Sequence, residues 1–157
     1  MATESVITQQ MQDAVGVDSA AATYVVEAGA VRRFAEAIGD PNPLYREERA
    51  ARRSRYGGLI APPTFLRSME AGEETVPFRN PYPEVLDGGS DWQYFEPVRV
   101  GDTITVVSRI AGLTERTGRL GPMLMVSRET EYTNQLGDTV AKQLSTYIYY
   151  SPSTGSD

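Results

Sequence analysis

The chain has 157 residues, of which 40% are hydrophobic and 23% are charged, as is usual for a single globular domain. The net charge of −6 disfavours nucleic-acid binding, which requires a concentrated basic face. Cysteine and histidine are both absent, so disulfides and thiolate chemistry are excluded and zinc would need an uncommon all-oxygen site. We therefore expect no metal and no cofactor. Without a secretory signal or an apolar run of about 20 residues, we also expect no membrane span and a cytoplasmic location.

The chain divides into one main domain and two short flanks. In residues 1–21, Ile7, Met11 and Val15 recur at a spacing of four, which predicts an N-terminal extension with a short amphipathic helix. The domain itself is expected to span 22–150. The Ser- and Gly-rich tail 151–157 is expected to be disordered.

The first half of the domain is predicted to be mainly helical. A short strand at 24–27 precedes a helix over 29–38, which Gly39 ends because glycine accepts the left-handed cap conformation. A charged helix is expected over 46–53. Pro63 is suited to the first turn of a further helix, which we expect to run to Glu74.

The second half is predicted to be a sheet. Four runs rich in β-branched and aromatic residues, separated by Gly, Pro and Asp, predict strands at 90–95, 102–111, 123–134 and 139–149. The connections are typical of a meander, so each strand is expected to pair antiparallel with the next. The apolar face of the helix after Pro63 would cover this sheet. The sequence thus predicts an α+β fold, a single hot-dog domain with a curved antiparallel sheet wrapped around a central helix.

Three segments then resemble the MaoC-type (R)-specific enoyl-thioester hydratases and dehydratases. Residues 34–45 resemble the family's Asp-x-Asn-Pro-(aliphatic)-His motif, 57–65 the entry to its central helix, and 91–102 its strand junction. The likeness covers about 22–150 and extends to the branch with the FAS1-like dehydratase N-terminal domain, including small subunits of mycolic-acid-type 3-hydroxyacyl dehydratases. It implies binding of an acyl thioester on CoA or acyl carrier protein and reversible addition of water across a 2,3-double bond.

The resemblance also shows what this chain lacks. The reaction needs a base, an acid and donors to the developing oxyanion. Asp40 stands at the family's Asp position, but Tyr45 stands where histidine is expected, and its pKa would have to fall by about three units from about 10. The family's oxyanion glycine falls at Pro62 or Pro63, which have no N–H, although Thr64 could supply a donor.

The leading hypothesis is therefore a subunit that binds the acyl thioester but is inactive alone, in a heteromeric hydro-lyase of lipid metabolism. Its partner would be a His-containing MaoC-like chain. The substrate-binding candidates implied by the resemblance are Asn42, Gly58, Ala61, Thr64 and Phe65.

Other readings of the sequence stay open. The chain could be a self-sufficient homodimeric hydratase that uses Asp40 and Tyr45, a hot-dog thioesterase that uses Asp40, or a binding module without turnover. Asp40 and Asn42 could equally serve to hold their loop in place. The acyl chain, its carrier and the direction of the pathway are left open as well.

One basic cluster is also open to two interpretations. It is typical of a solvated helix face, and the alternative is a local site for phosphate groups. Its members are Arg46, Arg49, Arg52, Arg53 and Arg55.

Overall fold

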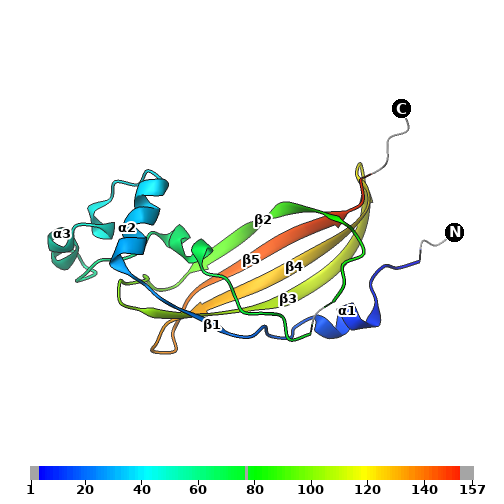
Figure 1. The fold of residues 1–157 in the computed structure, drawn as a ribbon, viewed down its shortest axis with the longest axis horizontal. Coiled ribbons are helices and arrows are strands. Elements are labelled where there is room, and N and C mark those ends of the chain that lie inside the picture. The colour runs from blue at the N-terminus through cyan, green and yellow to red at the C-terminus, as the bar shows by residue number, and fades with distance from the viewer. Residues whose placement is uncertain (1–3, 77, 153–157) are drawn as a thin grey trace.

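The computed structural model describes residues 4–76 and 78–152 (Figure 1). In chain order the elements are α1 (Gln9–Ala14), β1 (Ala22–Val25), α2 (Ala28–Ala37), the 3-10 helix η1 (Pro43–Tyr45), α3 (Glu48–Arg53), the 3-10 helix η2 (Pro63–Ser68), β2 (Glu84–Tyr94), β3 (Thr103–Gly118), β4 (Gly121–Thr133) and β5 (Thr139–Tyr150). Helices α2 and α3 lie together beyond one end of the sheet, and α1 lies near its other end (Figure 1). The part of the expected tail at 153–157 lies outside the described residues.

The five strands form one antiparallel sheet in the order β1-β3-β4-β5-β2. The predicted meander is right for β3, β4 and β5 but wrong for β2, which pairs with β5 at the far edge and not with β3. The physical reason is that β1 occupies the other side of β3, with Tyr24 opposite Ile104. The eight residues 95–102 join β2 to β3, a connection long enough to cross over β5 and β4.

The predicted helix over 63–74 is wrong in type and in length. The chain forms only a 3-10 helix that ends at Ser68, although its apolar face is buried as expected, with Phe65, Leu66 and Met69 all at most 6% exposed. This face packs against Ile104, Val106, Val140 and neighbouring residues in the larger of two hydrophobic clusters. The sheet therefore curves over a short helical turn in place of a long central helix.

After η2 the chain is extended and hydrogen-bonds to the segment before β1. The N–H of Gly72 donates to the carbonyl of Ala20 at 3.0 Å, and the N–H of Ala20 donates to the carbonyl of Glu73 at 2.8 Å. A Cβ on residue 72 would lie 2.5 Å from the carbonyl oxygen of Ala20, so only glycine allows this approach. The contact ties this segment to the chain that leads into β1.

A second hydrophobic cluster covers the other end of the sheet's inner face. Met11 and Ala14 of α1 pack there against Ile110, Leu124 and Val126. The N-terminal helix predicted from the spacing of Ile7, Met11 and Val15 thus exists.

In the described part of the chain no helix is long and apolar enough to cross a bilayer.

Candidate functional site

The Asp-x-Asn-Pro loop is held by its own side chains. The N–H of Asn42 donates to Oδ1 of Asp40 at 3.0 Å, and the N–H of Leu44 donates to Oδ1 of Asn42 at the same distance. Asn42 is the N-cap of η1, and Pro43 follows at its first position. Both polar side chains thus have a structural role that explains their presence without any catalysis.

Tyr45, at the family's histidine position, is buried at the end of η1 and is only 7% exposed. Burial raises the pKa of its phenol above the ordinary 10, and the negative charge of Asp40 and the nearby Tyr56 raise it further, while a hydrogen bond with Asn42 acts in the opposite direction. A base at neutral pH would need the pKa to fall. The environment of Tyr45 therefore keeps its proton in place.

A cavity of about 360 Å³ opens beside this tyrosine. Two of the predicted substrate-binding residues, Asn42 and Ala61, line it together with Tyr45. The rest of its wall is mostly apolar and comes from η1, the loop between α3 and η2, η2 itself, β2 and the chain that follows β2. Among these residues are Leu44, Tyr56, Ile60, Leu66, Tyr94 and Phe95.

The other predicted substrate-binding residues do not line this cavity. Phe65 is a core residue whose ring meets that of Phe34 edge-on at 5.5 Å. Thr64 is exposed on η2, and Gly58 lies in the loop before it, partly exposed. The structure brings together Asn42, Ala61 and Tyr45 at the cavity. The other three predicted residues, Gly58, Thr64 and Phe65, lie outside it.

The backbone at the start of η2 offers few free donors. Pro62 and Pro63 have no N–H, the N–H of Ala61 donates to the carbonyl of Val98 at 2.8 Å, and that of Phe65 donates to the carbonyl of Pro62 at 2.9 Å. An oxyanion hole needs free N–H groups aimed at one point. Among residues 61–65 this leaves the N–H of Thr64 as the candidate donor at the family's oxyanion position.

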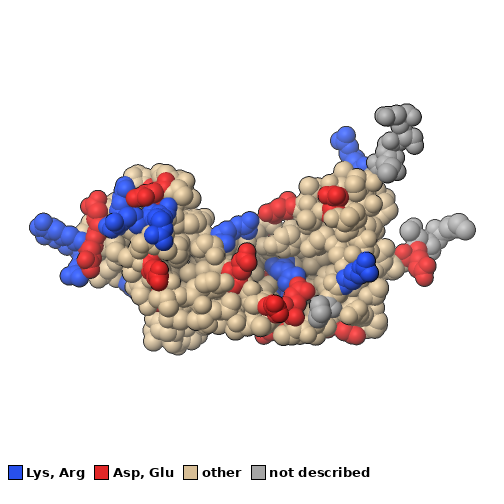
Figure 2. All heavy atoms as spheres, in the orientation of Figure 1, with Lys and Arg blue, Asp and Glu red and all other residues tan. Residues whose placement is uncertain are grey.

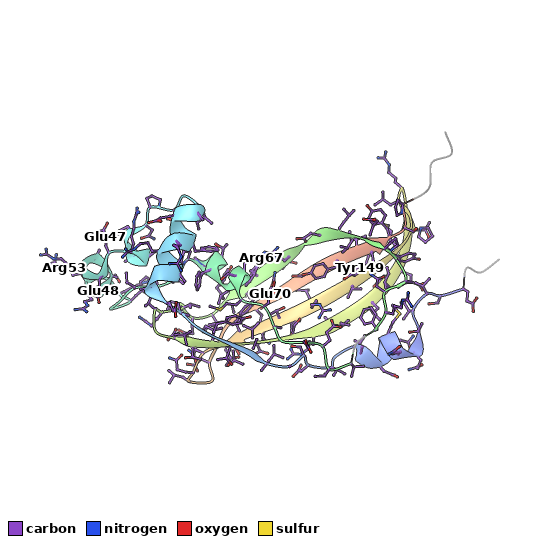
Figure 3. All side chains as sticks on the ribbon, viewed as in Figure 1. Glu47, Glu48, Arg53, Arg67, Glu70 and Tyr149 are labelled. Carbon is purple, nitrogen blue, oxygen red and sulfur yellow. The ribbon has the colours of Figure 1, made fainter. Side chains whose placement is uncertain are left out.

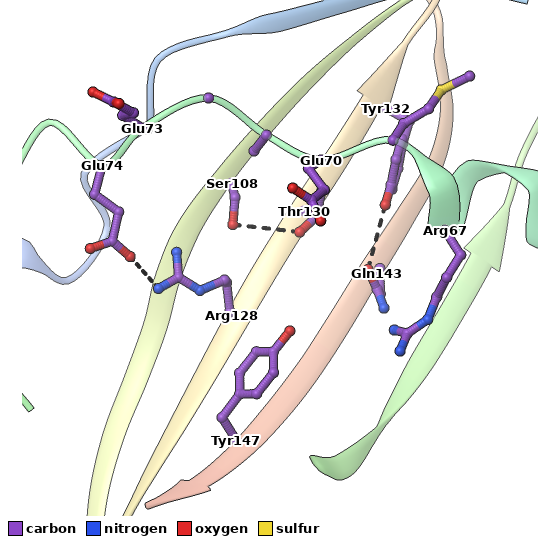
Figure 4. A pocket seen from close by; sticks show the side chains of 13 residues that line it. Arg67, Glu70, Glu73, Glu74, Ser108, Arg128, Thr130, Tyr132, Gln143 and Tyr147 are labelled. Atoms are coloured by element: carbon purple, nitrogen blue, oxygen red, sulfur yellow. Dashed lines mark hydrogen bonds and ion pairs between the residues drawn. The ribbon is translucent and has the colours of Figure 1, made fainter. Parts of the chain in front are cut away.

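A larger cavity, of about 530 Å³, lies over the middle of the sheet, where the sequence predicted no site (Figure 4). Its floor is made by Ser108, Arg128, Thr130, Tyr132, Gln143 and Tyr147 of β3, β4 and β5, and its opposite wall by residues 67–74. Arg67 and Glu70 lie where the chain leaves η2 and passes over the sheet (Figure 3). Residues 69–74, which the sequence predicted to be helical, are extended where they line the cavity. Its signal in the sequence is the alternation of polar residues in β3, β4 and β5.

The arginine cluster forms a mixed surface at the α3 end of the molecule (Figure 2). Arg52 pairs with Glu48 at 2.7 Å, Arg46 donates to the carbonyl of Pro41, and Arg55 lies over the ring of Tyr56. These contacts suit a solvated helix face, and only Arg55 also lines the smaller cavity.

The fold is a curved sheet covered by a short helix, with an Asp-x-Asn-Pro loop beside an apolar cavity. Together these features define a hot-dog protein of the hydratase and dehydratase class. The model of the family described as "FAS1-like, dehydratase domain region" matches residues 13–143, and the chain belongs to that family. A UPF0336 protein of Streptomyces avermitilis is 37% identical to it over 100 residues, which are 60% of this chain and 67% of the relative.

Solved structures agree with the family assignment. A MaoC-like dehydratase from Rhodospirillum rubrum superposes with a TM-score of 0.70 at 26% identity, covering 89% of this chain and 95% of the other. The HadBC (3R-hydroxyacyl-ACP dehydratase) complex from Mycobacterium tuberculosis, truncated at a C terminus, matches in fold with a TM-score of 0.63 at 22% identity, covering 81% and 90%. The predicted hot-dog fold and family resemblance are confirmed.

Proposed function

We propose that this chain is the acyl-accommodating, non-catalytic subunit of a heteromeric enoyl-thioester hydratase, or 3-hydroxyacyl dehydratase in the reverse direction. The observation that carries the proposal is Tyr45: a buried phenol with a raised pKa stands where the family has its proton-transferring histidine. The prolines at the start of η2 support the same view, because they remove N–H groups where the family stabilises an oxyanion.

The partner would be a His-containing MaoC-like chain that supplies the missing acid-base and oxyanion groups. The edge of β2 is the surface we assign to it. Among the described strands, β2 pairs with β5 alone, and Val85, Leu86, Tyr94 and Phe95 at or beside it are each at least 43% exposed. A long apolar edge strand favours pairing with another chain. The heteromeric HadBC dehydratase, which has the same fold, is a precedent for such an assembly.

The substrate would be an acyl thioester whose chain enters the apolar cavity beside Tyr45. Ligand pockets are mostly apolar with a few polar anchors. This cavity has that character, with Asn42 and Tyr45 as polar groups among Leu44, Ile60 and Leu66.

The test is hydration of crotonyl-CoA by the purified chain, alone and mixed with a His-containing MaoC-like chain from the same organism. We expect no turnover by the isolated chain and turnover by the mixture. Replacement of the partner's histidine should abolish activity, whereas Tyr45→Phe in this chain should change the rate by less than about tenfold, because no proton moves through its hydroxyl.

Two results would contradict the proposal. One is hydration by the isolated chain that falls about a hundredfold or more in both Asp40→Asn and Tyr45→Phe, the scale expected when an acid-base group is removed. The other is release of free CoA by the isolated chain, lost in Asp40→Asn, which would identify a thioesterase that uses this carboxylate.

A further inference from the structure

A belt of polar side chains crosses the inner face of the sheet between the two hydrophobic clusters. Ser108 of β3 lies opposite Thr130 of β4, which lies opposite Gln143 of β5. In the next row, Arg128 lies opposite Ser145. The larger cluster, with Val106 and Tyr132, lies on one side of this belt, and the smaller cluster, with Ile110 and Val126, lies on the other.

A polar belt at this place is unusual, because the inner face of a sheet normally carries apolar residues. Ser108, Gln143 and Ser145 are buried, with at most 7% of each exposed. Burying a hydroxyl or an amide costs free energy unless it has a good hydrogen-bond partner. The belt is therefore expected to have partners that compensate for its burial.

The hydrogen bonds within the belt are too long to do so. The hydroxyl of Thr130 lies 3.5 Å from that of Ser108, and the hydroxyl of Tyr132 lies 3.5 Å from Oε1 of Gln143 (Figure 4). Hydroxyl hydrogen bonds are normally about 2.7–2.8 Å long. A serine or threonine hydroxyl can donate once and accept twice, and a glutamine amide has two N–H groups. These groups therefore retain hydrogen-bonding capacity and face the cavity of about 530 Å³.

The charges around the cavity limit what it can hold. Arg67 and Arg128 line it together with three glutamates, and Arg128 is paired with Glu74. The remaining guanidinium, on Arg67, lies 3.7 Å from the carboxylate of Asp87. With acidic groups in excess and both arginines paired, the cavity does not favour an anion. It favours an uncharged ligand that carries oxygen atoms.

We propose that this cavity binds the oxygenated part of an acyl chain, with a hydroxyl, ketone or ether oxygen placed well away from the thioester. Thr130, Ser108 and Gln143 would hydrogen-bond to that oxygen. Met69, Ala71 and Tyr147, which also line the cavity, would contact the adjoining methylene groups. The acyl chain would extend to this cavity from the smaller one beside Tyr45. The inference rests on the proposed function, since it names the class of acyl chain that the subunit accommodates.

The test uses the full chain and two thioesters of equal length: stearoyl-CoA, and a hydroxystearoyl-CoA with its hydroxyl at mid-chain. Trp92 reports binding, because it is the chain's single tryptophan and its ring stacks on the cavity residue Tyr132 with centroids 5.5 Å apart. We expect the hydroxylated chain to bind about tenfold more tightly, as one or two added hydrogen bonds would give.

Two near-isosteric variants and one control locate the effect. Thr130→Val and Gln143→Leu should each remove most of the preference for the hydroxylated chain. Thr105→Val makes the same change as Thr130→Val on the opposite face of the sheet, where β3 residues alternate between partly exposed and buried positions, and should keep the preference.

Each outcome separates this inference from the proposed function. Equal binding of the two thioesters, or tighter binding of stearoyl-CoA, overturns the oxygen-binding role and leaves acyl binding intact. A preference that survives in both belt variants places the recognition elsewhere and also overturns the inference. Failure of both thioesters to bind would contradict the proposed function, and the inference with it.

Discussion

Tyr132 connects the polar belt to the larger hydrophobic cluster. It is 2% exposed, its ring stacks on Trp92, and its hydroxyl points toward Gln143. Burial raises its pKa to about 12, with smaller effects from neighbouring tyrosines that raise it and from Arg67, which lowers it. The folded protein thus holds this proton more tightly than the unfolded chain, in which the pKa is near 10.

This difference in pKa makes the stability of the fold depend on pH in the alkaline range. Because the pKa of Tyr132 is higher in the folded state, its protonated phenol contributes fully to the stability of the fold below about pH 10. This contribution is lost as the pH rises toward 12. A difference of about two units corresponds to roughly 2–3 kcal/mol. We expect the free energy of unfolding, measured in urea between pH 9 and about pH 11.5, to fall more steeply for the wild type than for Tyr132→Phe.

Tyr150→Phe is the matched control, since it makes the same change at the partly exposed end of β5. It should follow the wild-type pH dependence. Parallel curves for the wild type and Tyr132→Phe would show that ionisation of this phenol does not limit stability at high pH.

At the scale of elements, the extended segment after η2 forms one wall of the cavity over the sheet. Gly72 touches the backbone of Ala20, and Tyr24 is hydrogen-bonded to the same segment, its hydroxyl donating to the carbonyl of Glu70 at 2.8 Å. These contacts hold residues 69–74 against the segment that leads into β1. A helix continued through Glu74 would lose these backbone contacts.

Gly72→Ala tests how firmly this arrangement is held. Its Cβ would lie 2.5 Å from the carbonyl oxygen of Ala20, so the two segments must separate. We expect a loss of about 1–3 kcal/mol in the free energy of unfolding, the usual scale for steric overpacking.

Gly58→Ala is the control for the general effect of replacing glycine. A Cβ at residue 58 would meet nothing within 4 Å, and this glycine does not have a positive φ. Its substitution should be neutral or stabilise by up to about 1 kcal/mol through the unfolded chain. Equal stability changes for the two variants would mean that the close contact at Gly72 has no energetic role.

At the scale of the whole molecule, the sheet has two unequal edges. On one side, β1 and the chain before it line the edge of β3, with bridges from Val15 to Ile110 and from Asp18 to Arg109. On the other side, β2 pairs with β5 and has an outer edge with exposed apolar residues. A partner chain would dock at this second edge.

A charge placed on β2 should therefore weaken assembly. Leu86 is 43% exposed on this strand, and a lysine there would oppose strand pairing, as it does on natural edge strands. We expect Leu86→Lys to weaken association with the partner by roughly tenfold or more, measured by sedimentation of the mixed chains.

Leu136→Lys is the control, because Leu136 is 76% exposed in the turn between β4 and β5. Unchanged assembly in Leu86→Lys, or equal loss in both variants, would place the partner on another surface.

Local patterns in the sequence determined most of the elements. The spacing of apolar residues predicted α1 and α2, and the order of motifs at 34–45, 57–65 and 91–102 identified the family. Alternating β-branched residues located four strands, although β2 begins at Glu84, before the predicted 90–95, and β3 runs on to Gly118, beyond the predicted 102–111. The absence of histidine showed that the chain cannot supply the family's histidine base itself. These features depend on neighbours within a few positions, so they can be read from the chain alone.

Tertiary structure alone decided the two features on which the proposed oxygen-binding cavity depends. The first is the contact between Gly72 and Ala20, which no local pattern in the sequence indicates. The helical segment predicted to reach Glu74 ends at Ser68, and the extended chain after it lines a cavity over the sheet. Likewise, Ser108, Thr130 and Gln143 are unremarkable in their separate strands and become a polar belt only through the register of pairing. Contacts between distant segments depend on how the whole chain packs, which overrides local preference.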